Sequence, residues 1–246
     1  MAAPRDSREI LNDSPPTPAP ERLVYGPEPL QFGDWRVPDG DDSAPLVVLF
    51  HGGGWKSTFN LIHAGHMAIA LTDEGYRTFN VEYRRVGDPG GGWRGSFDDV
   101  LASIDYVLGR PDVDRDHVVL AGHSAGGHLA LLAASERKLP VVAMAAGSDL
   151  VGWQSESALA FLGDPRHAAE ASPRNRIPLG VRQIFVHGSD DDQVPAWLSA
   201  AFVEAARAAG DDAELVELPA AGHFDMIDPQ SVHWPRLVES VRAILG

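Results

Sequence analysis

Ser124 stands at the centre of Gly122-His123-Ser124-Ala125-Gly126, a G-x-S-x-G sequence between an apolar run and an Ala- and Leu-rich segment. A sharp turn from a strand into a helix exposes a serine hydroxyl at such a point, and small neighbours let the turn close. A hydroxyl presented in this way is a nucleophile for acyl transfer. A glycine-rich start of an ordinary helix is the alternative, but the placement favours Ser124 as the catalytic nucleophile.

A second glycine-rich segment, His51-Gly52-Gly53-Gly54-Trp55, follows directly on the apolar run PLVVLF. Acyl transfer builds negative charge on a carbonyl oxygen, and backbone N–H groups stabilise that charge where glycine lets the chain approach closely. We therefore predict an oxyanion hole formed by the N–H of Gly53 or Gly54 and the N–H of Ala125, the residue after the nucleophile. The alternative is a flexible glycine turn.

A base and an acid that orients it are expected after the serine, in the order Ser, Asp or Glu, His. Gly222-His223-Phe224-Asp225 supplies the base, His223, in the loop after the last predicted strand. The acid lies in His187-Gly188-Ser189 followed by three consecutive aspartates, 190–192. Neighbouring carboxylates repel, so one is expected to turn inward, and spacing does not select which.

The remaining histidines give weaker signals. His63 and His66 are three residues apart on a predicted helix, but without an H-E-x-x-H pattern or a third ligand we expect no metal site. His51 and His187 end predicted strands and are expected to brace loops.

Aromatic side chains near the predicted rim favour a small aromatic or acyl substrate. The residues expected to contact it are Trp55, Trp93, His123 and Phe224.

These segments need a frame that brings them together. Short β-branched runs alternate with helical patterns from residue 22 onward, which predicts right-handed βαβ crossovers and a single doubly wound α/β domain. We expect one mostly parallel, eight-stranded sheet with a small cap between the strands at 141–146 and 182–187. The expected strands are 22–26, 30–37, 45–50, 77–83, 117–122, 141–146, 182–187 and 213–218; the expected helices are 61–75, 96–110, 124–135, 195–210 and 230–245.

Composition sets outer limits. Residues 1–20 hold five prolines and few apolar side chains, which predicts a disordered arm before a single domain at 21–246. With 246 residues and a net charge of −15, the chain is a poor match for nucleic acid or anionic membranes. It has no cysteine, which removes disulfides, thiolate zinc sites and a cysteine nucleophile.

The first residues carry charges where a signal peptide needs an apolar stretch, and no run of apolar residues is long enough to span a membrane. We therefore expect a cytoplasmic protein whose partner is a small-molecule substrate. The oligomeric state is not predicted.

The motifs HGGGW, GHSAGGHLA, HGSDDDQVP and GHFDMID occur in an order that resembles the α/β-hydrolase superfamily from about Arg22 onward. Within it, the chain looks most like small carboxylesterases and arylformamidases of the kynurenine formamidase type. The resemblance places the acid on Asp191, the nucleophile on Ser124 and the base on His223. It implies cleavage of an ester or formamide through an acyl-enzyme, with no metal or organic cofactor.

Two alternatives stay open at this point. A peptidase of the prolyl-oligopeptidase type shares the same three residues, but the sequence shows no large propeller domain to screen peptides. A hydrolase fold that binds a ligand without turnover is the second, and the complete Ser, Asp and His set argues against it.

Overall fold

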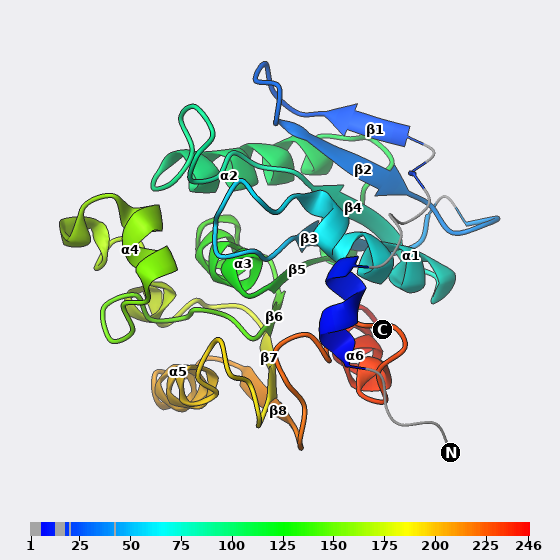
Figure 1. Ribbon diagram of the computed structural model, residues 1–246. Helices are drawn as coiled ribbons and strands as arrows, with labels where there is room; N and C mark the ends of the chain where they lie inside the picture. Colours follow the sequence, from blue (N-terminus) through cyan, green and yellow to red (C-terminus); the bar gives the residue numbers. More distant parts are fainter. Residues whose placement is uncertain (1–5, 13–17, 20, 42) are drawn as a thin grey trace.

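An eight-stranded sheet runs through the centre of the computed structural model, which describes residues 6–12, 18–19, 21–41 and 43–246. The strand order is β1-β2-β4-β3-β5-β6-β7-β8; β2 is antiparallel to both of its neighbours, and the pairs from β4 to β8 are parallel (Figure 1). The strands are β1 (Glu21–Val24), β2 (Phe32–Arg36), β3 (Leu46–Phe50), β4 (Arg77–Val81), β5 (Val118–His123), β6 (Val141–Met144), β7 (Gln183–Gly188) and β8 (Ala213–Leu218).

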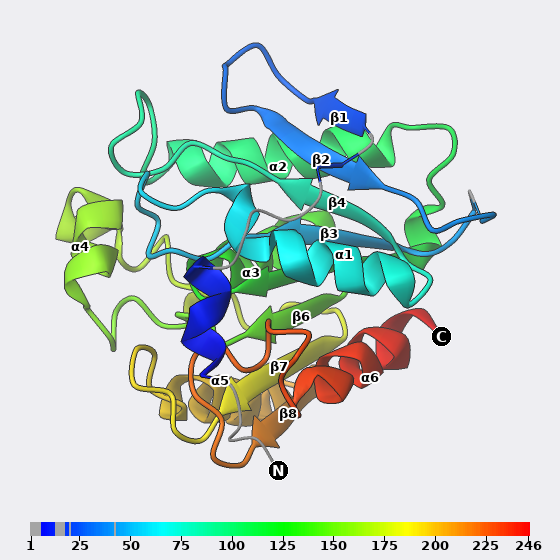
Figure 2. The same ribbon diagram turned by 45° about the vertical axis from the view of Figure 1, so that its right-hand side comes forward.

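Helices cover both faces of this sheet. The α-helices are α1 (Gly65–Asp73), α2 (Gly95–Leu108), α3 (Ala125–Arg137), α4 (Glu156–Leu162), α5 (Trp197–Ala208) and α6 (Trp234–Leu245). Short 3-10 turns are η1 (Ser7–Asn12), η2 (Leu61–Ala64), η3 (Arg115–His117), η4 (Pro165–His167) and η5 (Pro173–Arg176). In Figure 2, α1 and α6 lie on one side of the strands and α2 and α3 on the other.

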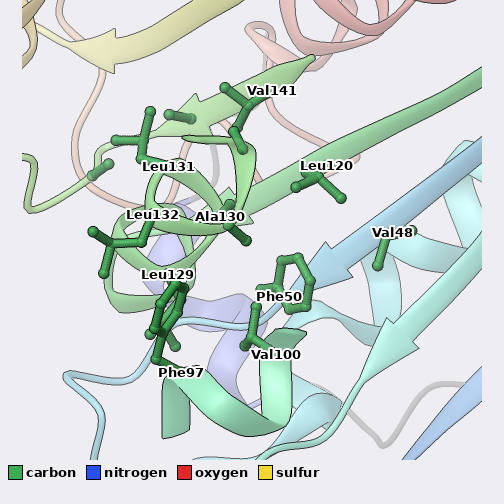
Figure 3. Packing of buried hydrophobic residues seen from close by; sticks show 14 of the residues in the cluster. Val48, Phe50, Phe97, Val100, Leu120, Leu129, Ala130, Leu131, Leu132 and Val141 are labelled. Carbon is green, nitrogen blue, oxygen red and sulfur yellow. The ribbon is translucent and has the colours of Figure 1, made fainter. Parts of the chain in front are cut away.

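The continuous apolar run of β3 is explained by the helices that cover both faces of the sheet. Leu46, Val48 and Phe50 pack into the core beneath α2 and α3, whereas Val47 and Leu49 pack into the core beneath α1 and α6. All five residues are fully buried. A strand covered on both faces needs apolar residues at every position, because alternate side chains point to opposite faces. Figure 3 shows Val48 and Phe50 beside side chains of α2 and α3.

The predicted eight-stranded, mostly parallel α/β sheet is confirmed, and each predicted strand overlaps an observed one. The helix expected at 61–75 begins at the predicted residue, but its first turn is the 3-10 turn η2 and the α-helix α1 follows from Gly65 to Asp73. The Asn60 side chain accepts a hydrogen bond from the N–H of Ile62 and so caps that turn.

The predicted small cap is the segment between β6 and β7, residues 145–182, which carries α4, η4 and η5. Ser155 caps α4 by accepting a hydrogen bond from the N–H of Ala158. The α4 helix is one that the strand and helix periodicity did not reveal, because its seven residues are too short to show a repeating apolar face.

Within the arm at 1–20 that is predicted to be disordered, the structure describes one short turn. Residues 7–12 form η1, with Ser7 and Ile10 buried at 4% and 6% exposure. Residues 1–5, 13–17 and 20 lie outside the described part of the chain. Within the described part, helices long and apolar enough to cross a membrane are absent.

Candidate active site

Ser124 lies at the sharp turn between β5 and α3, with φ 54° and ψ −116°. This backbone conformation is strained for a residue with a side chain, and the Ser124 N–H donates a 2.8 Å hydrogen bond to the carbonyl of Met144 that helps hold it. A side chain at Gly126 would overlap the backbone of Phe50, and one at Gly122 would overlap the backbone of Gly126. The turn therefore closes only because both flanking positions are glycine.

The glycine-rich loop after β3 runs beside this turn. Gly53 has φ +112°, and a Cβ there would overlap the Phe59 side chain, so the position requires glycine in both conformation and space. Gly53 and Gly54 line the same cavity as Ser124. Ala125, at the start of α3, is buried next to the serine.

Buried hydrogen bonds and an ion pair hold the start of this glycine-rich loop in place. His51 donates through Nδ1 to the Gly52 carbonyl at 2.8 Å, and its Nε2 lies 3.1 Å from Oε1 of Glu82. Glu82 also accepts a hydrogen bond from the N–H of Leu61 and pairs with Arg85 at 3.0 Å. The Tyr83 hydroxyl donates to the His51 carbonyl at 2.8 Å.

Burial by itself would raise the pKa of Glu82. The hydrogen bond from His51 and the positive charge of Arg85 outweigh it, so the pKa of this carboxyl lies below its ordinary value. Glu82 is therefore ionised, and it ties the start of the glycine loop to the loop that follows β4. His51 braces this loop, as its position at a strand end predicted.

The loop after β7 turns one of its three aspartates inward. The Asp191 side chain is fully buried, whereas Asp190 is exposed and the Asp192 side chain is 56% exposed. The Asp191 carboxylate accepts hydrogen bonds from the N–H groups of Gln193 and Val194 at 2.8 and 2.9 Å. Geometry therefore singles out the aspartate on which the superfamily resemblance placed the acid.

Two histidines complete the surroundings of Asp191. His223 Nδ1 lies 2.7 Å from Oδ2 of Asp191, and His187 Nε2 lies 3.2 Å from the same oxygen. Burial by itself would raise the pKa of Asp191, but the hydrogen bonds from His187 and His223 outweigh it and hold the pKa well below its ordinary value. Asp191 is an anion that fixes the orientation of the His223 ring.

His223 comes from the loop after β8. Its Nδ1 is engaged by Asp191, so Nε2 is the ring nitrogen left for a proton transfer, and His223 and Ser124 line one cavity. His123 Nε2 donates to the His223 carbonyl at 2.8 Å and anchors the backbone at this point.

Burial lowers the pKa of both His63 and His123, that of His63 to about 3, and the nearby His223 lowers both further. His63 accepts a 3.3 Å hydrogen bond at Nδ1 from the N–H of Gly52, and its ring stacks on that of His123 at 5.2 Å. The rings of His63 and His123, which lie beside His223, are thus neutral at pH 7.

Two cavities meet at Ser124. The first has a volume of about 210 Å³, and its walls include Gly53, Lys56, Phe59, His63, His223 and Phe224. The second has a volume of about 140 Å³, and its walls include Trp55, Ala125, Gly147, Trp153 and Val194. Gly54, Ser124, Ser157 and Gln193 border both.

Of the four residues predicted to contact the substrate, two are among the described walls of these cavities. Trp55 lines the second cavity and Phe224 the first. His123 is 0% exposed and braces the His223 loop, while Trp93 stacks on Phe97 at 5.7 Å, and neither is among the residues that form the described walls of these cavities. His123 is enclosed by the rings of His63, His223 and Phe224, and the partly buried Trp93 packs against Phe97 and Phe161, which explains the difference from the predicted substrate contact.

Several wall residues were not foreseen. Ser157 belongs to α4 in the cap, Gln193 follows the acid, and Phe59 and His63 follow the glycine loop. For Gln193, Phe59 and His63 the available signal was a position a few residues after a predicted site segment, whereas Ser157 had only its place in the predicted cap. Among the described residues there is no group of three or more His, Cys, Asp or Glu side chains placed to hold a metal ion.

Comparison with known proteins identifies one matching family and several similar proteins. Residues 35–148 match the family described as BD-FAE. The chain is 30% identical to Esterase LipC of Mycobacterium tuberculosis, over 84% of this chain and 60% of that protein. It is 26% identical to dipeptidyl aminopeptidase BIII of Pseudoxanthomonas mexicana, over 74% of this chain and 30% of that protein.

Among solved structures, apo esterase 2 of Thermogutta terrifontis aligns with a TM-score of 0.79 at 22% identity, over 95% of this chain and 96% of that chain. The chain has the α/β-hydrolase fold. In this fold the loops after β3, β5, β7 and β8 meet at the carboxyl edge of the sheet, where ligands bind in open α/β sheets. The chain spans less than two thirds of either curated relative.

Proposed function

We propose that the protein is a serine esterase that cleaves carboxylic esters with a short acyl group. One observation carries the proposal: the buried Asp191 carboxylate holds the His223 ring at 2.7 Å, and His223 and Ser124 line one cavity. The match to BD-FAE over residues 35–148 and the similarity to Esterase LipC support it.

In this proposal His223 takes the proton of Ser124 as its hydroxyl attacks the ester carbonyl, and Asp191 stabilises the imidazolium that results. The N–H of Ala125 and that of Gly53 or Gly54 stabilise the oxyanion, a contribution of about 3–4 kcal/mol for one such donor. His223 then protonates the departing alcohol. Water attacks the acyl-enzyme with His223 again as the base.

The reaction assigns a role to each cavity. The departing alcohol must lie within reach of His223, which lines the first cavity but not the second. The acyl group therefore occupies the second cavity, between Trp55 and Trp153 and close to Ala125. At about 140 Å³ this space is smaller than the pockets of roughly 300–1,000 Å³ that hold drug-sized ligands, so a short acyl chain fits it.

A formyl group is the smallest acyl group, and the cavity therefore also accommodates an aryl formamide. We keep arylformamide cleavage as the finer form of the proposal, in which the Phe59 and Phe224 rings would contact the aromatic amine in the first cavity. The nucleophile and base would be unchanged.

A comparison of phenyl acetate, N-formylkynurenine and a proline-containing aminoacyl anilide tests the substrate class. We expect turnover of phenyl acetate by the wild type and its loss in Ser124→Ala. Full activity in Ser124→Ala would overturn the proposal, and preference for the anilide would favour the peptidase that the 26% match to dipeptidyl aminopeptidase BIII raises.

An organophosphonate probe separates catalysis from simple ligand binding. The probe should label Ser124 in the wild type and leave Ser124→Ala unlabelled. A wild-type protein that binds the aryl ester but resists the probe would instead be a ligand-binding hydrolase fold.

A further inference from the structure

We propose that the N-terminal turn η1 forms the outer wall of the leaving-group site, so that an aryl alcohol extending past His63 binds against Ile10. This inference rests on the proposed esterase function and names the alcohol class that it accepts. In Figures 1 and 2 the blue turn lies between the cyan segment that follows β3 and the orange loop that follows β8.

A third cavity lies beside η1 and has two wall residues in common with the site cavity. It has a volume of about 260 Å³, and its walls include Ile10, Thr58, Phe59, Ile62, His63 and His66. Phe59 and His63 also line the cavity that holds Ser124 and His223. The two cavities therefore adjoin at Phe59 and His63, and in this proposal a leaving group too large for the first extends past these side chains into the third.

The character of this wall selects the alcohol. Ile10 is buried at 6% exposure, and Phe59 provides an aromatic ring at the shared boundary. Burial lowers the pKa of His63 to about 3, so this boundary is uncharged at neutral pH. An uncharged aromatic ring gains most from contact with such a surface, because burial of apolar area is the main source of its affinity.

Two contacts fix η1 in this place. The Ser7 hydroxyl donates a 3.0 Å hydrogen bond to Oδ1 of Asp225, two residues after His223. Arg8 forms an ion pair with Asp192, the neighbour of Asp191. The turn is thus fastened to the loop of the base and to the loop of the acid.

Substitution of Ile10 tests the wall. For Ile10→Ala we expect kcat/KM for 2-naphthyl acetate to fall about tenfold, mainly through KM, while kcat/KM for methyl acetate stays within about twofold of the wild-type value. Val24→Ala, which removes an aliphatic side chain that is 62% exposed on β1, is the matched control and should change neither value. An equal fall for both esters, or no fall for either, would overturn the proposal.

Charge reversal tests the fastening independently. Arg8→Asp should raise KM for 2-naphthyl acetate. The double variant Arg8→Asp with Asp192→Arg should bring KM most of the way back to the wild-type value, because the ion pair is re-formed with opposite polarity. A double variant no better than Arg8→Asp would show that this pair does not place the turn, against the proposal.

Binding of the product alcohol separates this inference from the proposed function. Fluorescence titration with 2-naphthol needs no turnover, and Ile10→Ala should weaken its affinity about tenfold relative to the wild type. If the wild type hydrolyses neither acetate, the esterase proposal fails while this titration still decides the binding wall. Equal affinities in the two proteins would refute the wall.

Discussion

Asp191 shows how a single residue acts through its hydrogen-bond partners. Its buried carboxylate faces His223 and His187 and accepts two backbone N–H groups. An amide in its place has only one oxygen to accept hydrogen bonds, and its NH2 group would favour the wrong tautomer of His223. The superfamily resemblance selected this aspartate, and the geometry adds the reason, since Asp190 and Asp192 point to solvent.

For Asp191→Asn we expect a fall in kcat of about 10⁴ with little change in KM, which steady-state kinetics on phenyl acetate measures. Asp190→Asn is the matched control, because it removes the neighbouring exposed charge and should keep kcat within about twofold. A small loss in Asp191→Asn would mean that another acid orients the base.

Glu82 is a residue whose importance is visible only in the fold. Replacing it with glutamine removes the negative charge that faces His51 and Arg85 inside the protein. We expect Glu82→Gln to lower the free energy of unfolding by about 1.5–3 kcal/mol, the range for hydrogen bonds to charged groups. Urea unfolding measures this loss, and Glu204→Gln on the exposed face of α5 should stay within about 0.5 kcal/mol of the wild type.

At the scale of elements, the glycine loop after β3 requires glycine at position 53, both because a side chain would not fit there and because φ is positive. In Gly53→Ala the new Cβ would overlap the Phe59 side chain at a φ of +112°, so the proposed oxyanion donors would shift. We expect kcat to fall about 10²–10³-fold, the cost of losing one such donor, with stability also reduced.

Gly210→Ala separates the two effects. Gly210 has φ +90° but open space around it, at the end of α5. This variant should lose stability of about 1 kcal/mol while kcat stays unchanged. A comparable loss of kcat in both variants would argue against a specific role of the Gly53 loop.

The elements were predictable to different degrees. Strands such as β3 and β7 were clear because burial on both faces demands continuous apolar runs. The sharp turn at Ser124 and the glycine loop after β3 were visible because their geometry permits few residue types. The cap helix α4 and the turn η1 were not, since each is short and is stabilised by contacts distant in sequence, such as that between Ser7 and Asp225. His123 was misleading because sequence proximity to Ser124 does not reveal that its ring is buried.

At the scale of the whole molecule, buried neutral histidines tie stability to pH. His128 is 0% exposed beneath Trp55 and Phe161, and burial lowers its pKa to about 4. The unfolded chain, with a histidine pKa of about 6.5, binds this proton more strongly. The stabilisation is therefore complete above pH 6.5 and is lost as the pH falls towards 4.

We expect His128 to account for about 1 kcal/mol of the stability lost between pH 7 and pH 5.5. Urea unfolding at both pH values should show a smaller loss in His128→Gln than in the wild type by about this amount. Replacement of His117, which is exposed at the surface, is the control and should leave the pH dependence intact. Parallel losses in His128→Gln and the wild type would exclude this histidine as the source.

The bond between Ser7 and Asp225 joins residues 218 positions apart in the chain. A ribosome must therefore add those residues before the turn can find its place, although the turn is made among the first. His223 emerges at almost the same moment. During synthesis, Ser124 and the glycine loop are therefore made well before His223, and the proposed hydrolytic centre is incomplete until the loop after β8 has been added.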